Sequence, residues 1–312
     1  MTGCRPEDRP IRLYIQKGVI NLNKPSGPTS HEVTAWIKRI LGLKKVGHGG
    51  TLDPRATGVL PIMLEDATKI SHILLSSEKE YVGLMRLHEI VSEAKLLNVF
   101  SEFEGPIYQM PPLKSAVKRR RRKRMIYKMD LLELDGKDLL FKVRCESGTY
   151  IRVLCHEIGK SLGVGANMYE LRRTFSNPFR EDEGVTMHDL IDSYVLWRED
   201  GEEKYLRRNI LPMEDALKHL PKIYIKDSAV DAICYGAYLA APGILKIEQD
   251  ISVGDTVALF TRKEEVVALA MAKMPLKRGG SYKKGIVADT NRVLMPPNTY
   301  MKCWKRAGVA EW

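Results

Sequence analysis

The stretch GHGGTLDPRATGVLP, residues 47–61, isolates one aspartate, Asp53, among four glycines and two prolines. Glycine allows a bulky partner to approach the backbone and adopts positive φ angles that other residues avoid. Pro54 fixes its own φ and biases Asp53 towards an extended conformation. Two interpretations stay open from this stretch alone. Asp53 either accepts hydrogen bonds from nearby backbone N–H groups in a turn, or carries chemistry.

The overall charge indicates a polyanionic partner. The chain has 312 residues, of which 44% are hydrophobic, so it is long enough for two domains with two cores. Its formal net charge is +11. A membrane surface is the weaker choice of partner, because the sequence has no 18-residue apolar run, no signal-peptide segment and no basic amphipathic helix. Nucleic acid is therefore the favoured partner, and no membrane partner is expected.

Cysteine usage and missing motifs exclude several classes of function. The five cysteines are scattered and never form a CxxC pair, which favours reduced thiols in a cytoplasmic setting over a disulfide framework or a zinc ribbon. No HExxH, GxGxxG, Walker A or GxSxG motif occurs. We therefore expect neither a metal site nor a nucleotide cofactor. The cysteines are Cys4, Cys145, Cys155, Cys234 and Cys303.

Hydrophobic periodicity predicts interspersed strands and helices in the first two thirds of the chain. A helix should begin after Thr29, because Thr29 and Glu32 form a capping-box signature. A second helix should end at Leu162, with Gly163 just beyond it. The expected strands cover residues 18–24, 58–64, 79–87 and 139–145, and a further helix covers 66–77. Without regular βαβ spacing, this order favours a mixed α+β domain.

The composition changes near residues 198–222. Residues 198–209 form a charge run that predicts a solvated segment, and residues 211–221 predict a short connecting helix. Short β-like segments separated by glycine and proline follow, which is typical of a small β-barrel of roughly 80 residues. At the other end, residues 1–17 are polar and charged and predict an extension or linker.

Seven consecutive cations form the second conspicuous feature. Such a run is usually a solvated charge run. Here it is internal and preceded by the proline-punctuated segment 109–117, so we favour a mobile basic loop that closes on phosphates. The loop would supply affinity with little sequence reading. The residues are Lys118, Arg119, Arg120, Arg121, Arg122, Lys123 and Arg124.

Two further residues are candidates for the same site. Tyr81 lies at the start of the strand 79–87, where half-buried sheet packing is the plainer interpretation. Arg152 follows Tyr150 at the start of a predicted helix. An arginine at a helix N-terminus opposes the helix dipole, so this position calls for a nearby anion or carboxylate.

Several blocks in a fixed order together resemble the TruB/dyskerin family of RNA pseudouridine synthases, and within it the archaeal dyskerin-type subunits of H/ACA ribonucleoproteins. The resemblance covers nearly all of the chain. The blocks are GVINLNKPSGPTSHEV (18–33), VGHGGTLDPRATGVLP (46–61), KEYVGLMRL (79–87), IYQMPPLKSAVKRR (107–120), SGTYIRVLCHEIG (147–159), LRRT (171–174) and DSAVDAICYGAYLAAPGI (227–244).

The resemblance implies an α+β architecture with two domains. The pseudouridine synthase fold, a mixed and largely antiparallel sheet with flanking helices and a central cleft, would cover residues 18–217. A small C-terminal PUA β-barrel, which binds RNA, would cover 218–304. Residues 1–17 would be an N-terminal extension and 305–312 a tail.

The same resemblance assigns the site. Asp53 would be the catalytic aspartate, Tyr81 would stack on the target base or take up a proton, and Arg152 would pair with Asp53. The residues His48, Tyr81, Tyr150, Leu171 and Lys24 would bind the target nucleotide. In the PUA domain, Gly236 and Gly243 would bind RNA. No metal and no cofactor are implied.

The implied reaction breaks the C1′–N1 bond of uridine, rotates the uracil and forms a C1′–C5 bond. The target base must leave its helix or loop, which requires a stacking face and an apolar wall. The implied partners are an H/ACA guide RNA, rRNA and tRNA substrates, and small protein subunits. A stand-alone enzyme for the TΨC-loop uridine of tRNA and a non-catalytic RNA scaffold stay open as alternatives, as does the choice of Asp53 as nucleophile or base.

Overall fold

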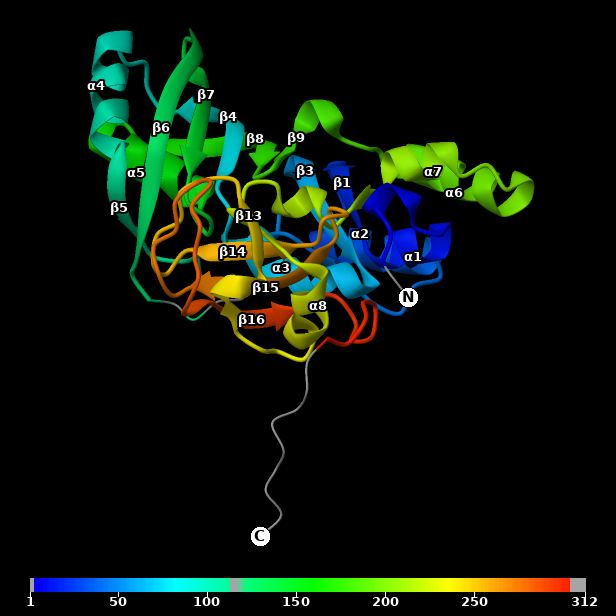
Figure 1. Ribbon diagram of the computed structural model, residues 1–312. Helices are drawn as coiled ribbons and strands as arrows, with labels where there is room; N and C mark the ends of the chain where they lie inside the picture. Colours follow the sequence, from blue (N-terminus) through cyan, green and yellow to red (C-terminus); the bar gives the residue numbers. More distant parts are fainter. Residues whose placement is uncertain (1–2, 113–117, 119, 304–312) are drawn as a thin grey trace. The chain divides into compact units, whose positions relative to one another are not determined.

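The computed structural model describes residues 3–112, 118 and 120–303 (Figure 1). The chain divides into two compact units. One unit is Val19–Leu211, and the other combines Met1–Gly18 with Pro212–Trp312. The domain limits expected from the sequence stay a prediction. Within the described ranges, no helix has the length and apolar character to cross a membrane.

One large mixed sheet organises the unit Val19–Leu211. In spatial order its strands are β1 (Gly18–Lys24), β3 (Thr57–Leu64), β8 (Ala166–Ser176), β4 (Lys79–Leu87), β7 (Asp138–Cys145), β6 (Arg122–Asp135) and β5 (Gly105–Gln109). These neighbours are antiparallel except for β3 and β8, which pair in parallel, so the expected mixed and largely antiparallel sheet is confirmed. Two short strands, β2 (Val46–His48) and β9 (Phe179–Arg180), pair with β3 and β8.

Two helix ends of this unit agree with the capping signals in the sequence. The capping box at Thr29 is complete, since Glu32 N donates to Thr29 Oγ1 at 3.1 Å and Thr29 N to Glu32 Oε2 at 2.7 Å. Gly163 adopts φ 78° after the last helical residue, as its position predicts. The helices are α2 (Ser30–Ile40), η2 (Glu65–Ile70), α3 (Ser71–Ser76), α4 (Glu93–Phe103), α5 (Ile151–Leu162), η3 (Glu181–Glu183), α6 (Met187–Asp200) and α7 (Lys204–Asn209).

The contact between β3 and β8 fixes where the Asp53 loop ends. Gly58 on β3 pairs with Arg173 on β8 and has φ 95°. A Cβ atom at Gly58 would lie 2.2 Å from the Arg173 carbonyl oxygen, so any other residue would separate the two strands. Glycine is therefore required at this position by both its φ angle and the close approach.

Strand β8 contains two irregularities in its pairing with β4. The register shifts between Glu80 and Tyr81, where Thr174 is the extra residue of β8, and again between Leu84 and Met85. At the second shift Tyr169 is the extra residue, because its neighbours Glu170 and Met168 pair with Leu84 and Met85. Such bulges bend a strand and redirect side chains.

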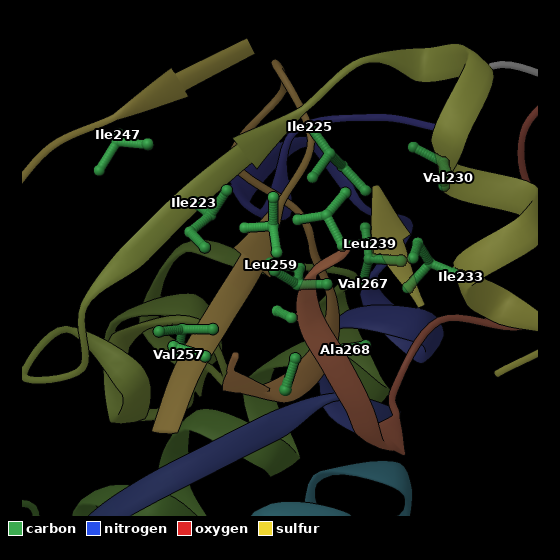
Figure 2. Packing of buried hydrophobic residues seen from close by; sticks show 14 of the residues in the cluster. Ile223, Ile225, Val230, Ile233, Leu239, Ile247, Val257, Leu259, Val267 and Ala268 are labelled. Atoms are coloured by element: carbon green, nitrogen blue, oxygen red, sulfur yellow. The ribbon is translucent and has the colours of Figure 1, made fainter. Parts of the chain in front are cut away.

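A six-stranded sheet forms the core of the second unit. Its order is β12-β16-β15-β14-β11-β13. Apolar side chains from several strands, among them Ile225, Leu239 and Leu259, point towards one another, which confirms the small barrel (Figure 2). The elements are β11 (Lys222–Ile225), α8 (Asp227–Cys234), β12 (Leu239–Ala240), η5 (Ala241–Gly243), β13 (Ile244–Ile247), β14 (Thr256–Phe260), β15 (Val266–Ala272) and β16 (Ile286–Val293).

The N-terminal segment is part of this second unit and carries structure that its polar composition does not suggest. It contains η1 (Pro6–Asp8) and α1 (Ile11–Gln16). The buried Arg9 donates Nη1 to Glu214 Oε2 at 3.0 Å and Nη2 to Glu214 Oε1 at 2.6 Å. Glu214 Oε1 also accepts from Val266 N at 3.1 Å. A buried bidentate pair with a further backbone donor holds the segment in place.

The charge run 198–209 is largely exposed to solvent, as expected, and it forms the end of α6 and all of α7, with Leu206 buried. Three other expectations about local structure need correction. The predicted helix 66–77 is a 3-10 helix followed by α3. The predicted helix 211–221 is only the turn η4 (Asp215–Leu217) after the short strand β10 (Leu211–Pro212). The predicted basic loop is wrong for Arg122, Lys123 and Arg124, which begin strand β6.

Candidate active site

Asp53 lies in the loop between β2 and β3 and faces solvent. Arg152, in the first turn of α5, forms an ion pair with Asp53 Oδ2. About half of each side chain is exposed, 47% for Asp53 and 56% for Arg152. In the described part of the chain, the Asp53 carboxylate receives this bond from Arg152 and none from its own loop. The anion that the position of Arg152 calls for is therefore Asp53.

A cleft of about 1070 Å³ opens at this ion pair. Both Asp53 and Arg152 line it, together with Leu171 of β8. Its other walls come from the loop after Asp53 and from β4, β7 and β8. These further lining residues are Ser26, Pro54, Arg55, Ala56, Thr57, Val82, Leu84, Leu140, Met168, Tyr169, Glu170 and Arg172. The cleft thus combines a carboxylate, several cations and an apolar wall.

Tyr81 lies behind the cleft rather than on its surface. Its side chain is buried on β4, next to β8. Burial raises the pKa of Tyr81, the neighbouring Arg173 guanidinium opposes this shift, and the Asp53 carboxylate adds a smaller upward effect. Tyr81 therefore stays a neutral phenol at ordinary pH, within the electrostatic range of Asp53.

Lys24 supports the Asp53 loop from inside the protein. Its side chain is fully buried, and Nζ donates to Pro25 O at 2.9 Å, Pro54 O at 3.0 Å and Ala56 O at 2.9 Å. An ammonium group has three N–H donors, so all of them are used within the protein. Burial and the nearby Arg173 lower the pKa of Lys24. This geometry does not support direct contact of Lys24 with a substrate.

Arg173 is one of the site residues that the sequence did not single out. It is buried, and it donates Nε to Val59 O at 2.6 Å and Nη2 to Gly50 O at 3.1 Å. These two carbonyls flank Asp53 on either side along the chain. The signal available was LRRT, because successive strand residues face opposite sides and one of the two arginines must point inward. That signal requires β8, which periodicity did not predict.

Lys79 is a second buried cation beside the same loop. Its Nζ donates to Leu74 O at 2.7 Å and to Ser77 O at 2.6 Å, which satisfies carbonyls at the end of α3. Burial next to Arg173 lowers the pKa of Lys79 to about 7. Gly50, with φ 137°, lies against both cations, since a Cβ there would be 3.6 Å from Arg173 and 3.7 Å from Lys79.

The remaining predicted pocket residues lie at different depths. His48 stands edge-on to His31, with 5.1 Å between ring centroids, and burial lowers the pKa of His48 to about 4, so it is neutral at ordinary pH. Leu171 lines the cleft. Tyr150 is the half-buried N-cap of α5, and its backbone N–H donates to Gln109 Oε1 at 2.9 Å. The structure thus brings Asp53, Arg152 and Leu171 to the cleft surface.

The predicted RNA-binding cations divide into two kinds. Lys118, Arg120 and Arg121 are exposed, and Arg121 covers the ring of Tyr108 with 5.1 Å to its centroid. Within β6, Arg124 is half-buried and pairs with Glu146 at 3.3 Å. Arg119 lies outside the described residues.

The two glycines predicted to bind RNA lie in the second unit. Gly236 follows α8 with φ 86°, and a Cβ there would meet open space. Gly243 ends η5, and its carbonyl accepts from Lys226 N at 2.9 Å. Among the described residues no three metal-ligating side chains gather, and the expectation of a metal-free enzyme stays a prediction.

Known families match the chain over almost its whole length. The TruB family pseudouridylate synthase (N terminal domain) matches residues 38–151, and the tRNA pseudouridylate synthase B C-terminal domain matches 152–218. A PUA domain matches 221–294, and a DKCLD (NUC011) domain matches 1–34. The chain therefore belongs to the TruB family of pseudouridine synthases, which are isomerases.

Individual relatives narrow this class. The chain is 60% identical to the "Probable tRNA pseudouridine synthase B" of Methanopyrus kandleri, over 97% of this chain and 89% of the relative. It is 59% identical to the protein of that name in Pyrococcus horikoshii, over 97% and 91%. A solved Cbf5-Nop10-Gar1 complex contains a chain 56% identical, with TM-score 0.90 and coverage of 96% and 92%. A chain in a solved H/ACA RNP bound to a substrate RNA is 53% identical, with a TM-score of 0.89, over 97% of this chain and 93% of that chain. The chain is also 53% identical, with a TM-score of 0.86, to a chain of an archaeal box H/ACA sRNP Nop10-Cbf5 complex, so its similarity includes archaeal Cbf5.

Proposed function

We propose that this pseudouridine synthase isomerises uridines selected by an H/ACA guide RNA, with Asp53 as the catalytic carboxylate. The observation that carries the proposal is the Asp53–Arg152 pair, which is exposed in a large cleft and held by no bond from the Asp53 loop itself. A carboxylate used only to shape a turn would accept bonds from that turn.

The groups at the cleft surface each have a task in this reaction. Arg152 fixes the direction of the Asp53 carboxylate through a charge-assisted bond. Leu171 gives the flipped base an apolar wall. The Asp53 carboxylate either attacks C1′, displaces N1 and is then itself displaced by C5, or removes the C2′ proton as N1 leaves and returns it when C5 bonds to C1′. In both routes C5 loses its proton and N1 gains one, so the product is an isomer of the substrate.

The proposed partners follow the solved relatives. Those relatives occur in complexes named for H/ACA RNP, Nop10 and Gar1, and they match nearly the whole chain. We extend this assembly to the present chain, with rRNA as the guided substrate and the PUA domain as a holder of RNA. The free cysteines of this chain favour a cytoplasmic setting.

A stand-alone activity on the TΨC-loop uridine of tRNA is the second candidate. It is favoured by the names of the curated relatives, which are probable tRNA pseudouridine synthases. A non-catalytic scaffold is disfavoured, because it has no use for a carboxylate exposed next to bound RNA.

The test compares the wild type with Asp53→Ala on a guide–target RNA pair, in the presence of the small subunits, and on tRNA alone. We expect the variant to bind both RNAs and to form no pseudouridine. The matched control is Asp182→Ala, which removes an exposed aspartate paired with Arg180 at 3.3 Å. Pseudouridine formation by Asp53→Ala would refute the catalytic assignment, and product on tRNA but never on guided RNA would favour the second candidate.

A further inference from the structure

An exposed tyrosine stands in the cleft wall without a role in the reaction described above. Tyr169 of β8 is 59% exposed, although large aromatic side chains are usually well buried. It lines the same cleft as Asp53 and Leu171. It precedes Leu171 by two positions, which corresponds to about 7 Å along a strand. Tyr169 therefore lies one step beyond the apolar wall expected to contact the target base.

The exposure of Tyr169 follows from an irregularity in the backbone of β8. It is the extra residue of the β8 bulge, where Glu170 pairs with Leu84 and Met168 pairs with Met85. A bulge frees one side chain from the alternation of a regular strand and redirects it. The neighbouring strands β4 and β7 continue in regular register past this point, so the irregularity is confined to β8.

One face of the ring is already covered. The guanidinium carbon of Arg86 on β4 lies 4.8 Å from the centroid of the Tyr169 ring. Arg86 is itself fixed by Asp138 of β7, to which Nε donates at 2.6 Å and Nη2 at 2.7 Å. Arg86 and Asp138 are also direct cross-strand partners. A planar cation held in this way orients the ring and leaves it fewer rotamers to lose on binding.

An oriented aromatic ring with free surface suits an unpaired nucleobase. Single-stranded bases stack on aromatic side chains in a sequence-tolerant manner, and cations behind the ring strengthen the interaction. The cleft also exposes Arg55, which provides positive charge for an adjoining phosphate.

We propose that Tyr169 is a stacking platform for the nucleobase adjacent to the target uridine in the bound RNA. This inference rests on the proposed use of the Asp53 cleft for RNA. Tyr169 binds RNA in this account and touches none of the reacting atoms, so it acts on substrate affinity and placement.

The test uses full-length protein and a target RNA that carries 2-aminopurine at one position on either side of the target uridine. In the guided case it is assembled with guide RNA and small subunits. Stacking quenches 2-aminopurine fluorescence. We expect the wild type and Tyr169→Phe to quench the probe at one flanking position. Tyr169→Leu should lose that quench and bind the RNA about 5-fold or more weakly.

Two controls make the outcome specific. Tyr205→Leu removes another exposed tyrosine that carries a cation, Lys204, 5.9 Å from its ring centroid, but that does not line the cleft. It should leave both quench and affinity unchanged. The Asp53→Ala protein should keep the quench, which separates failure of the catalytic assignment from failure of the platform. An unchanged quench and affinity in Tyr169→Leu would overturn the proposal.

Discussion

Two groups of cations in this protein differ in what surrounds them. Around the Asp53 loop, Lys24 and Arg173 are buried and donate to backbone carbonyls. In the basic segment, Lys118, Arg120 and Arg121 face solvent. Buried cations that donate to backbone carbonyls fix geometry, whereas exposed cations attract phosphates from a distance. The conspicuous charge run is therefore expected to govern RNA affinity, and the inconspicuous single residues to govern the chemical step.

The largest effect on stability is expected for Arg173→Met. It leaves the Val59 and Gly50 carbonyls without their donor in a buried place, at a cost of about 4 kcal/mol in free energy of unfolding. Urea denaturation measures this cost. The control Arg172→Met removes the neighbouring half-exposed arginine, whose pair with Glu181 is at the surface, and should cost about 1 kcal/mol or less. Equal losses in both variants would contradict the comparison.

Lys24→Met is expected to have the next largest effect. Three backbone carbonyls lose a charge-assisted donor, so the free energy of unfolding should fall by about 3 kcal/mol, and the folded variant should bind RNA with unchanged affinity. Lys38→Met, at an exposed position of α2, is the matched control and should change neither quantity. A selective loss of RNA affinity with unchanged stability would restore the role of Lys24 in substrate binding.

His48 links the stability of the site to pH. Its pKa is about 4 in the folded protein and about 6.5 in the unfolded chain, so the unfolded chain binds more protons between these values. Stability from this group is fully present above pH 6.5 and should fall by roughly 2–3 kcal/mol as the pH drops to 4. His48→Gln should flatten this part of the pH profile in denaturant titrations. An equal slope in wild type and variant would show that His48 is not the titrating group.

The smallest effect on stability is expected in the basic segment. Replacing Lys118, Arg120 and Arg121 by serine should leave the free energy of unfolding unchanged. The affinity for every RNA should fall by about the same factor, roughly tenfold at moderate salt. The dependence of log K on log salt should also become flatter. Serine at Lys38, Arg39 and Lys44 provides a control with three other exposed cations. Binding that does not respond to the first set would make the segment a solvated charge run.

The sequence was sufficient to predict features that depend on a few neighbouring residues. The structure contains three of these: the capping box at Thr29, the helix end at Gly163 and the strand 79–87. Asp53 and Arg152 were expected to meet, and they form an ion pair. The catalytic and RNA-binding roles of the predicted site residues stay predictions.

Features that depend on residues far apart in the sequence could not be predicted. The polar segment around Arg9 gives no sign that Arg9 is buried, because its partner Glu214 lies far away in the sequence. Arg173 supports the Asp53 loop because β3 pairs in parallel with β8, and no local sequence pattern predicts this pairing. The bulge that exposes Tyr169 likewise exists only in the register between β8 and β4. Burial and register are properties of the assembled sheet.

The most direct test of the account is single-turnover pseudouridine formation at saturating protein, measured beside the Kd for RNA in Arg173→Met and in the triple serine variant of the basic segment. Both are assayed at a temperature where circular dichroism shows them folded. We expect Arg173→Met to lose about 100-fold in rate with unchanged Kd, because the Asp53 loop is misplaced. The triple variant should keep its rate and lose affinity. The opposite division, with Arg173→Met impaired only in binding, would contradict the account.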